Sequence, residues 1–489
     1  MFNKNLSLYT AEQSRAIDEL ALERLNVSSN VLMQRAAQFA FDVALKHWPN
    51  MNTVSVFAGK GNNAGDAFLF ARLAQEYGIK VQLFMITDLS ELNEESKLAY
   101  KKIDLSSVQK ESSFSDISGD LIIDGLIGTG LRGAPEGPYS EAIRLINDTN
   151  IPVLSLDIPS GVNASTGAVV NAAVLAQVTT TFISHKIGLH VGKGRIHSGE
   201  IKMDSLGVPK ALFSRFPGIE LSVFEPAQLP PLAMDTYKNR QGHLLIIGGD
   251  EGMPGSILMA AEAALRAGAG LVTVATRKEH LGIVVSRIPE VMVTEADIEN
   301  LSRSYLKYDA VLIGPGLGRK EWGKALYQAC LSWSVPLIVD ADGLFWMATE
   351  DRPVSDTVIV SPHTGEAARL LGVDSSLIEQ DRINSAKEIR NRFGAIGVVK
   401  GPGSVVFGHK KISICEHGNP GMATAGMGDV LSGVIGGFVV QRSIDFETCL
   451  EIAVLLHSAA ADQAVKDFGQ RSLMATDVIR FLPRVMQSD

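Results

Sequence analysis

The segment Asn419–Val440 reads NPGMATAGMGDVLSGVIGGFVV and carries more information than any other stretch of the chain. Its first half is dense in glycine, ends at Asp429 and leads into an apolar helix predicted over Val430–Val440. Free backbone N–H groups at a helix N-terminus bind anions, and a carboxylate beside them can accept a proton. We therefore predict a phosphoryl-transfer site in which Asp429 takes the proton of an attacking hydroxyl group. In the competing interpretation Asp429 only caps the helix.

Short apolar strands alternate with helical stretches on both sides of this segment, which is typical of parallel-sheet α/β domains. In the second half, strands are predicted at His243–Ile247, Leu271–Ala275, Asp309–Ile313, Pro336–Val339, Val358–Val360 and Gly397–Lys400. In the first half, they are predicted at Thr53–Ala58, Lys80–Ile86, Leu121–Asp124, Val153–Asp157 and Thr179–Ile183. The proline-rich stretch Leu206–Pro231 lacks sustained periodicity and places a boundary near residue 222. The sequence thus predicts two tandem α/β domains, 1–222 and 223–489.

The composition is that of an ordinary globular chain of 489 residues, 46% of them apolar, with a formal net charge of −9. This acidic balance gives no electrostatic footprint for nucleic acid. No apolar run reaches membrane-spanning length, and the first ten residues lack a secretory signal. Cys330, Cys415 and Cys449 show no metal-ligand spacing and are expected to be buried and reduced. We expect a cytoplasmic protein with neither nucleic-acid nor membrane partners.

Three predicted strand ends in the first half lead into loops rich in glycine and polar residues. Strand Thr53–Ala58 runs into GKGNNAGD (59–66), followed by a helix predicted over Ala67–Tyr77. The strand ending at Asp124 runs into GLIGTGLRGA (125–134), and the strand ending at Asp157 runs into IPSGVN (158–163). Because ligands of parallel sheets bind beyond the carboxyl ends of strands, these loops predict one site. The competing interpretation is a loose dinucleotide fingerprint with a turn-capping Asp124.

The second half has further loops of this kind. GPGLG (314–318) follows a predicted strand, and KGPGS (400–404) between two strands predicts a nucleotide-holding loop. The P-loop pattern GxxxxGK[ST] is absent from the sequence, so the nucleotide site belongs to another phosphoryl-transfer fold. In SPHTGE (361–366), His363 stands at the start of a predicted helix, where a purely structural histidine is the competing interpretation.

The first half resembles the NAD(P)H-hydrate epimerase family in the runs AGKGNNAGDA, IIDGLIGTGLRGAP, LDIPSGVNASTG and TFISHKIGLHVGKG. The resemblance implies a Rossmann-like three-layer parallel-sheet domain with a potassium ion held by Asn63, Asp124 and Ser160, oxygen ligands that suit a hard cation. It implies a substrate lining formed by Asn62, Asn63, Ala64, Gly65, Asp66, Gly128, Thr129, Gly130, Leu131, Arg132, Gly133, Ala134 and Asp157. Asp124 is also the predicted proton-moving group. The family's usual glycines are replaced here by Ala64 and Ala67, and a methyl group at a glycine turn can obstruct close backbone approach or forbid positive φ.

The second half resembles the ribokinase-like superfamily, and within it the NAD(P)H-hydrate dehydratase branch. The runs that carry this resemblance are IIGGDEGMPGS, AALRAGAGLVTVAT, GPGLG, IVDADGL, SPHTGEAARLLG, VKGPGSVV and GNPGMATAGMGD. It implies that the adenine nucleotide is held by Lys400, Gly401, Pro402, Gly403, Ser404 and Gly428. It implies contacts to the hydrated dinucleotide from Ser256, Gly316, His363 and Asp429. Position 256 is usually alanine in the family.

Together the two resemblances imply a bifunctional enzyme that repairs NADHX and NADPHX, the hydrates of NADH and NADPH. The second half would phosphorylate the ring hydroxyl of the S epimer, and loss of phosphate would restore the double bond. The first half would interconvert the R and S epimers. ADP is the expected phosphoryl donor in preference to ATP, magnesium is the expected divalent ion, and a homo-oligomer is expected. Two alternatives stay open: a small-molecule kinase of the same superfamily, and a first half that binds dinucleotides without catalysis.

Overall fold

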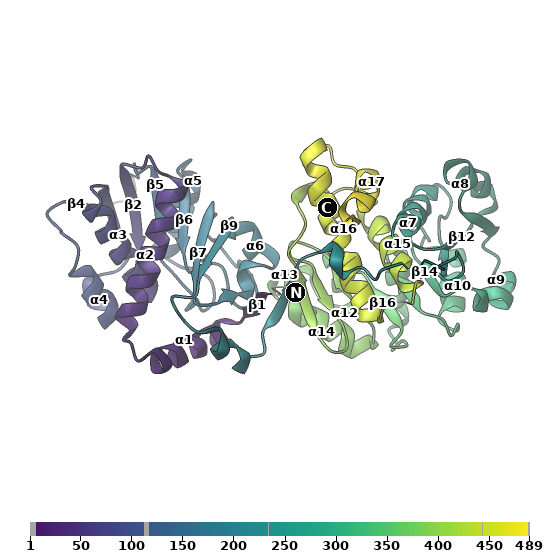
Figure 1. Ribbon diagram of the computed structural model, residues 1–489, viewed down its shortest axis with the longest axis horizontal. Coiled ribbons are helices and arrows are strands. Elements are labelled where there is room, and N and C mark those ends of the chain that lie inside the picture. The colour runs from purple at the N-terminus through teal and green to yellow at the C-terminus, as the bar shows by residue number, and fades with distance from the viewer. Residues whose placement is uncertain (1–5, 112–116, 233, 443, 488–489) are drawn as a thin grey trace. The chain divides into compact units, whose positions relative to one another are not determined.

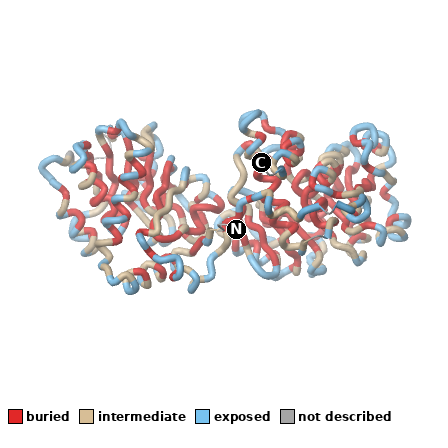
Figure 2. The backbone as a smooth tube through the Cα atoms, viewed as in Figure 1, coloured by how far each residue is buried: buried red, intermediate tan, exposed pale blue. Residues whose placement is uncertain are grey.

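The computed structural model describes residues 6–111, 117–232, 234–442 and 444–487, and the chain divides into two compact units (Figure 1). The first unit spans Leu6–Ile219, and the second begins at Glu220. Each unit is built around its own sheet, whose central strands are buried (Figure 2). The predicted fold class, two tandem α/β domains, is confirmed.

The first unit contains a seven-stranded sheet in the order β4-β3-β2-β5-β6-β7-β9. All of its strand pairs are parallel. The strands are β2 (Thr53–Ala58), β3 (Lys80–Met85), β4 (Val108–Glu111), β5 (Leu121–Gly125), β6 (Val153–Leu156), β7 (Val178–Phe182) and β9 (Glu200–Asp204). Outside this seven-stranded sheet, β1 (Leu6–Tyr9) pairs with β8 (His185–Lys186) in parallel. Because β2, β5 and β6 are neighbours, the three predicted loops meet at one edge of the sheet.

Helices cover both faces of this sheet. They are α1 (Ala11–Leu25), α2 (Ser29–His47), α3 (Asn62–Glu76), α4 (Glu94–Tyr100), α5 (Pro138–Asp148) and α6 (Gly192–Ser198). Alternate strand residues point to opposite faces, so Val56 packs in the core beneath α1–α4 while Phe57 packs in the core beneath α5. The unit therefore has three layers, with the sheet in the middle.

The second unit contains a mixed sheet in which β13-β12-β11-β14-β15-β16-β17 are parallel and β18 is antiparallel to both of its neighbours. Its strands are β10 (Ile219–Ser222), β11 (His243–Ile247), β12 (Leu271–Thr276), β13 (Met292–Glu295), β14 (Ala310–Ile313), β15 (Leu337–Val339), β16 (Val358–Val360), β17 (Ile396–Val399), β18 (Val405–Phe407) and β19 (Ile412–Cys415). β10 pairs with β19 in parallel. The functional loops follow the carboxyl ends of the parallel strands.

Small residues allow the helices of the second unit to pack closely. The helices are α7 (Pro254–Arg266), α8 (Leu281–Arg287), α9 (Ile298–Ser304), α10 (Glu321–Cys330), α11 (Asp342–Glu350), α12 (Thr364–Leu371), α13 (Ser375–Gln380), α14 (Arg382–Phe393), α15 (Met427–Val439), α16 (Phe446–Phe468) and α17 (Ala475–Met486). The main core cluster joins one face of the sheet to α7, α15, α16 and α17. A Cβ atom on Gly433 of α15 would lie 2.2 Å from the Ala260 carbonyl oxygen of α7, so this crossing requires glycine. The apolar helix α15 is thereby fixed under the site.

The predicted strands are all present, and their ends agree to within one residue. The structure adds β1, β4, β8, β9, β10, β13, β18 and β19, which are short or lie towards sheet edges. Two helix starts were predicted wrongly: α3 begins at Asn62 instead of Ala67, and α15 begins at Met427 instead of Val430. Within the described residues, no helix is long and apolar enough to cross a membrane. Cys330, Cys415 and Cys449 are buried and form no disulfide, as predicted.

Candidate functional sites

The site in the first unit is centred on Asp124 near the end of β5. Its side chain is fully buried and accepts hydrogen bonds at both carboxylate oxygens. Oδ1 accepts from the Ser160 hydroxyl at 2.5 Å and from the Leu126 amide at 3.3 Å. Oδ2 accepts from the Ser155 hydroxyl at 2.8 Å and from the Ser160 amide at 2.9 Å. Burial raises the pKa of Asp124, and these hydrogen bonds oppose the shift. The predicted pair Asp124 and Ser160 is thus in direct contact.

Asn63 reaches the same place from the first turn of α3. Its side chain is 6% exposed, and neither its amide nitrogen nor its amide oxygen has a hydrogen-bond partner among the described residues. A Cβ atom on Gly128 would lie 3.5 Å from Cγ of Asn63 and 3.5 Å from Oδ2 of Asp157. Asn63, Gly128 and Asp157 therefore converge. Buried polar groups are rarely left without a partner, so the bare amide indicates a ligand position.

The far end of the predicted substrate loop is more open. Thr129, Leu131 and Ala134 are half-buried, whereas Gly130, Arg132 and Gly133 are exposed. Cβ atoms added to Gly130 or Gly133 would meet nothing within 4 Å. The structure thus brings Gly128 to Asn63 and leaves the rest of the loop facing free space.

Ala64 and Ala67 lie inside α3 and not in a turn. Neither residue has a positive φ, and both are fully buried, so the expectation that their methyl groups strain a glycine turn is wrong. The close approach falls on the neighbouring strand instead, where a Cβ atom on Gly125 would lie 2.5 Å from Cβ of Ala67. Gly125 leaves the space that the Ala67 methyl group fills.

Two residues that sequence reasoning missed join this site. Lys186 of β8 is 3% exposed, and its ammonium contacts Oδ1 of Asp157 at 2.5 Å. Asp18 of α1 is electrostatically coupled to Lys186 and Asp157. The signal for Lys186 was a lysine within the apolar run TFISHKIGL. Asp18 lies in an ordinary polar helix and carries no comparable signal.

The site in the second unit is centred on Asp429. This residue is in the first turn of α15, which is capped by Gly426 with φ +87°, so Asp429 is not the cap and the capping interpretation is wrong. Burial raises the pKa of Asp429 to about 6, and the Asp340 carboxylate adds to the shift. Hydrogen bonding from Ser256 and the charge of Lys400 oppose it. Asp429 thus combines a raised pKa with a position among helix N-terminal amides.

Asp340, which is buried, and Lys400, which is half-buried, form an ion pair beside Asp429. The Lys400 ammonium lies 3.0 Å from Oδ1 of Asp340, and Oδ2 of Asp340 accepts a hydrogen bond from the Ser432 hydroxyl at 2.5 Å. A Cβ atom on Gly428 would lie 3.2 Å from the same ammonium nitrogen. Asp340 was not predicted as a site residue, although it directly follows a predicted strand within IVDADGL.

The predicted nucleotide loop is compact. The Gly401 amide donates to the Ser404 hydroxyl at 3.2 Å, and that hydroxyl donates to the Gly401 carbonyl at 3.0 Å. Gly401 and Gly403 both have positive φ, and a Cβ atom on Gly401 would overlap the Arg382 guanidinium. The Lys400 side chain turns away from this loop towards Asp340, so the loop can offer a nucleotide mainly its backbone.

Gly316 and His363 complete the predicted set. Gly316 has φ +59°, and a Cβ atom there would lie 3.3 Å from Cβ of Ser256, so these two residues adjoin. His363 is the N-cap of α12: its Nδ1 accepts from the Gly365 amide at 3.0 Å, and its own amide donates to Glu366 at 2.8 Å. Glu366 also lies 3.8 Å from the Lys400 ammonium. His363 therefore has a structural role at the border of the site while its side chain remains exposed.

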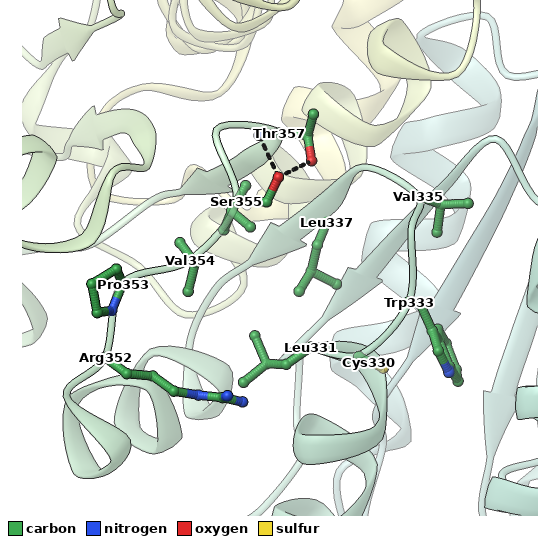
Figure 3. Close-up of a pocket in the computed structure, with 11 residues that line it drawn as sticks. Cys330, Leu331, Trp333, Val335, Leu337, Arg352, Pro353, Val354, Ser355 and Thr357 are labelled. Atoms are coloured by element: carbon green, nitrogen blue, oxygen red, sulfur yellow. Dashed lines mark hydrogen bonds between the residues drawn. The ribbon is translucent and has the colours of Figure 1, made fainter.

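A separate cavity of about 140 Å³ lies at the amino ends of β15 and β16, opposite to the carboxyl ends that lead into the site (Figure 3). It is lined by Leu337 and Val358, the first residues of β15 and β16, together with Cys330 and Arg352. It is smaller than the 300 Å³ or more, roughly, that small-molecule sites occupy. Since the site residues follow the carboxyl ends of these strands, this cavity is distinct from the site.

The two sites differ in the donor atoms that they can offer to the implied metal ions, potassium and magnesium. Among the described residues, no group of three or more His, Cys, Asp or Glu side chains is arranged to hold a metal. The predicted potassium set contains one carboxylate, one hydroxyl and the partnerless amide of Asn63, an oxygen donor set that fits an alkali cation. The carboxylates of Asp340 and Glu366 lie 3.0 Å and 3.8 Å from the Lys400 ammonium, and this pair fits magnesium because magnesium needs only one or two carboxylates beside phosphates.

Comparison with known proteins covers both halves of the chain. Residues 244–484 match the family described as NAD(P)H-hydrate dehydratase, and residues 29–188 match the family described as YjeF-related protein N-terminus. The bifunctional NAD(P)H-hydrate repair enzyme of Escherichia coli is 40% identical over 99% of this chain and 94% of its own length. The enzyme of the same description from Coxiella burnetii is 39% identical, covering 97% and 98% of the two chains. A ribokinase-like superfamily protein of known structure from Enterococcus faecalis aligns with a TM-score of 0.50 and 29% identity, over 54% of this chain and 95% of that one.

Proposed function

The chain belongs to the family of bifunctional NAD(P)H-hydrate repair enzymes, and from this premise we propose that it restores NADH and NADPH from their hydrates by two reactions in two domains. Residues 1–222 would carry the epimerase and residues 223–489 the dehydratase. The epimerase supplies the S epimer that the dehydratase consumes. Fusion of the two activities lets one chain repair both epimers.

In the epimerase domain, we propose that Asn63, Asp124 and Ser160 hold potassium. The buried, partnerless amide of Asn63 supports this assignment, and the contact between Asp124 and Ser160 provides the other two oxygen donors. Bound potassium would supply a fixed positive charge facing the polar atoms of the substrate. The loops Asn62–Asp66 and Gly128–Ala134, with Asp157, would enclose the hydrated nicotinamide. That Asp124 moves a proton stays a prediction.

In the dehydratase domain, the first turn of α15 supports phosphoryl transfer. Asp429 would accept the proton of the ring hydroxyl while that oxygen attacks the terminal phosphorus of ADP, and AMP would leave. The amides around Gly428 would hold the transferring group, and Lys400–Ser404 would hold the nucleotide. Ser256, Gly316 and His363 would contact the dinucleotide. Phosphate then leaves as a proton is lost from the adjacent carbon, which restores the double bond.

Magnesium would be held by Asp340 and Glu366 together with the nucleotide phosphates, whose charge it would offset. Lys400 already places one positive charge between these carboxylates. The observation that carries the proposal is the grouping of Asp340, Lys400 and Asp429 at the N-terminus of α15, in which Asp340 is buried and the other two are half-buried. We further infer a cytoplasmic homo-oligomer that acts on both NADHX and NADPHX.

Purified epimers test the proposal. With S-NADHX and ADP, the full-length chain should regenerate the near-ultraviolet absorbance of NADH and release AMP and phosphate in equal amounts. With the R epimer, regeneration should require interconversion first and thus show a lag. A stable phosphate ester in place of NADH would indicate the small-molecule kinase. Regeneration from S alone would indicate a first half that binds dinucleotides without catalysis. Replacing ADP by ATP identifies the preferred donor.

A further inference from the structure

Four ionisable side chains from four elements share a buried region of the epimerase domain. They are Asp18 of α1, Asp66 of α3, Asp157 after β6 and Lys186 of β8. The Lys186 ammonium is held by Oδ1 of Asp157 at 2.5 Å, the Thr181 hydroxyl at 3.0 Å and the Phe182 carbonyl at 2.8 Å. Glu19 adds a further negative charge near Asp18. In this set the carboxyl groups outnumber the single ammonium.

Asp157 connects this cluster to the substrate loop. Its backbone adopts φ +64°, a left-handed conformation that is uncommon for residues other than glycine and clusters at functional sites. The turn is fixed by a hydrogen bond from the Asp157 amide to the Thr180 carbonyl at 2.6 Å. One carboxylate oxygen contacts Lys186, and the other faces Gly128, whose added Cβ would lie 3.5 Å away. Asp157 thus presents its second oxygen to the space beside Asn63.

Asp66 lies on the same face of α3 as Asn63, three residues further along the helix. It is 8% exposed. Burial raises the pKa of Asp66 well above its ordinary range, the charges of Asp157 and Asp18 raise it further, and Lys186 opposes them. Burial also raises the pKa of Asp18, to about 7, against the influence of Lys186. Asp66 therefore favours its protonated form more than an ordinary carboxyl group does, while Asp157 is paired with an ammonium.

We propose that Asp66 and Asp157 are the catalytic acid and base of epimerisation, and that Lys186 is a positioning residue that holds Asp157. This rests on the proposed function of the domain. The hydroxyl group of the hydrate is on the carbon next to the ring nitrogen, because water adds to an enamine at that carbon. A buried carboxyl group on the Asn63 face of α3 can donate a proton at that carbon, and a carboxylate oxygen that faces Gly128 can accept one.

The reaction then proceeds in two steps. Asp66 gives its proton to the hydroxyl oxygen as the C–O bond breaks, water leaves, and the lone pair of the ring nitrogen forms a C=N bond. Water adds to the opposite face of the same carbon, the C=N electrons return to nitrogen, and Asp157 takes the proton of the adding water. Proton exchange with solvent restores Asp66 and Asp157. Atoms and charge balance, and no oxidant or further reactant is required.

Steady-state kinetics of R-to-S conversion by the full-length chain test this assignment. Asp66→Asn and Asp157→Asn should each lower kcat by about 10²–10⁴-fold with little change in KM. Glu76→Gln, which removes an exposed carboxylate from the end of the same helix, should leave kcat unchanged. Dehydration of the S epimer and the thermal midpoint of the epimerase domain report whether each variant is folded. If Asp124 is the proton-moving group instead, both Asn variants will epimerise at nearly the wild-type rate, and the proposal is wrong.

The pH profile distinguishes a positioning role of Lys186 from a merely structural one. In the wild-type chain, the epimerisation rate should fall at low pH, where the base is protonated, and at high pH, where the acid is ionised. Lys186→Met removes the positive charge that contacts Asp157, so the acid limb of the epimerisation profile should move to higher pH. Lys186→Arg should restore the limb. If Lys186→Met and Lys186→Arg lose the same fraction of the epimerisation rate and the acid limb stays at the wild-type pH, Lys186 does not position Asp157. The same pH profile tests the proposal if Asp66→Asn or Asp157→Asn fails to fold. A wild-type chain that does not interconvert the epimers would instead refute the proposed function.

Discussion

The carboxylate of Asp429 should act as a base only when it is ionised, and its environment sets the pH range. Burial and the Asp340 charge raise its pKa to about 6. With this value the group is almost fully ionised at pH 7.5 and only about one-tenth ionised at pH 5, by the ordinary titration relation. Dehydratase kcat/KM for S-NADHX should therefore fall about tenfold per pH unit below the pKa. The dehydratase rate falls as the pH falls, because protonated Asp429 cannot accept the proton of the ring hydroxyl.

Substitution of Asp429 separates this effect from acid damage to the protein. Asp429→Asn should lower the dehydration rate by about 10²–10⁴-fold, or about 3–5 kcal/mol of transition-state stabilisation, while epimerisation continues. Asp374→Asn is a matched control, because Asp374 is an exposed N-cap and Asn caps helices equally well. The assay is recovery of NADH absorbance with ADP. A dehydration rate that stays constant down to pH 5, or a fully active Asp429→Asn chain, would refute the base assignment.

Three further predictions concern single positions. Ser256→Ala removes the hydrogen bond that lowers the pKa of Asp429, so the acid limb of the dehydratase pH profile should move to higher pH. An unmoved acid limb would show that the Ser256 hydroxyl does not contact Asp429. Gly125→Ala places a methyl group against Ala67 and should lower the unfolding free energy of the epimerase domain by about 1–3 kcal/mol. The double variant Gly125→Ala/Ala67→Gly should recover this loss. Urea denaturation measures both effects. Exchange of potassium for sodium should slow epimerisation but not dehydration, and Asp124→Asn should abolish that cation dependence; epimerisation insensitive to cations would contradict the proposed ion.

The strands could be predicted because each is a short apolar run bounded by turn residues, a local property of the sequence. The starts of α3 and α15 could not be predicted in the same way. Gly65 lies in the first turn of α3 and Gly428 in the first turn of α15, and a glycine at such a position argues against a helix in a sequence-based prediction. Glycine has low helix propensity, but packing overrides it: a Cβ on Gly65 would lie 2.6 Å from the Met33 sulfur. Tertiary contacts therefore decide where these helices begin.

Most of the site residues that could be predicted lie at strand ends, in the loops that follow them or in the first turns of the next helices, where the sheet topology brings them together. Asp340 also directly follows a predicted strand, within IVDADGL, but was not predicted as a site residue. Asp18 and Lys186 could not be predicted from strand ends, because only the packing of the unit brings α1 and β8 to Asp157. No pattern within a helix such as α1 indicates which of its carboxylates becomes buried beside a lysine.

The most direct test of two activities in one chain starts from an equal mixture of R- and S-NADHX. The full-length enzyme is incubated with ADP, magnesium and potassium, and near-ultraviolet absorbance is followed to completion. We expect recovery of essentially all the NADH, with one phosphate released per hydrate repaired. Recovery that stops at the S fraction would contradict the epimerase assignment, and no recovery at all would contradict repair itself.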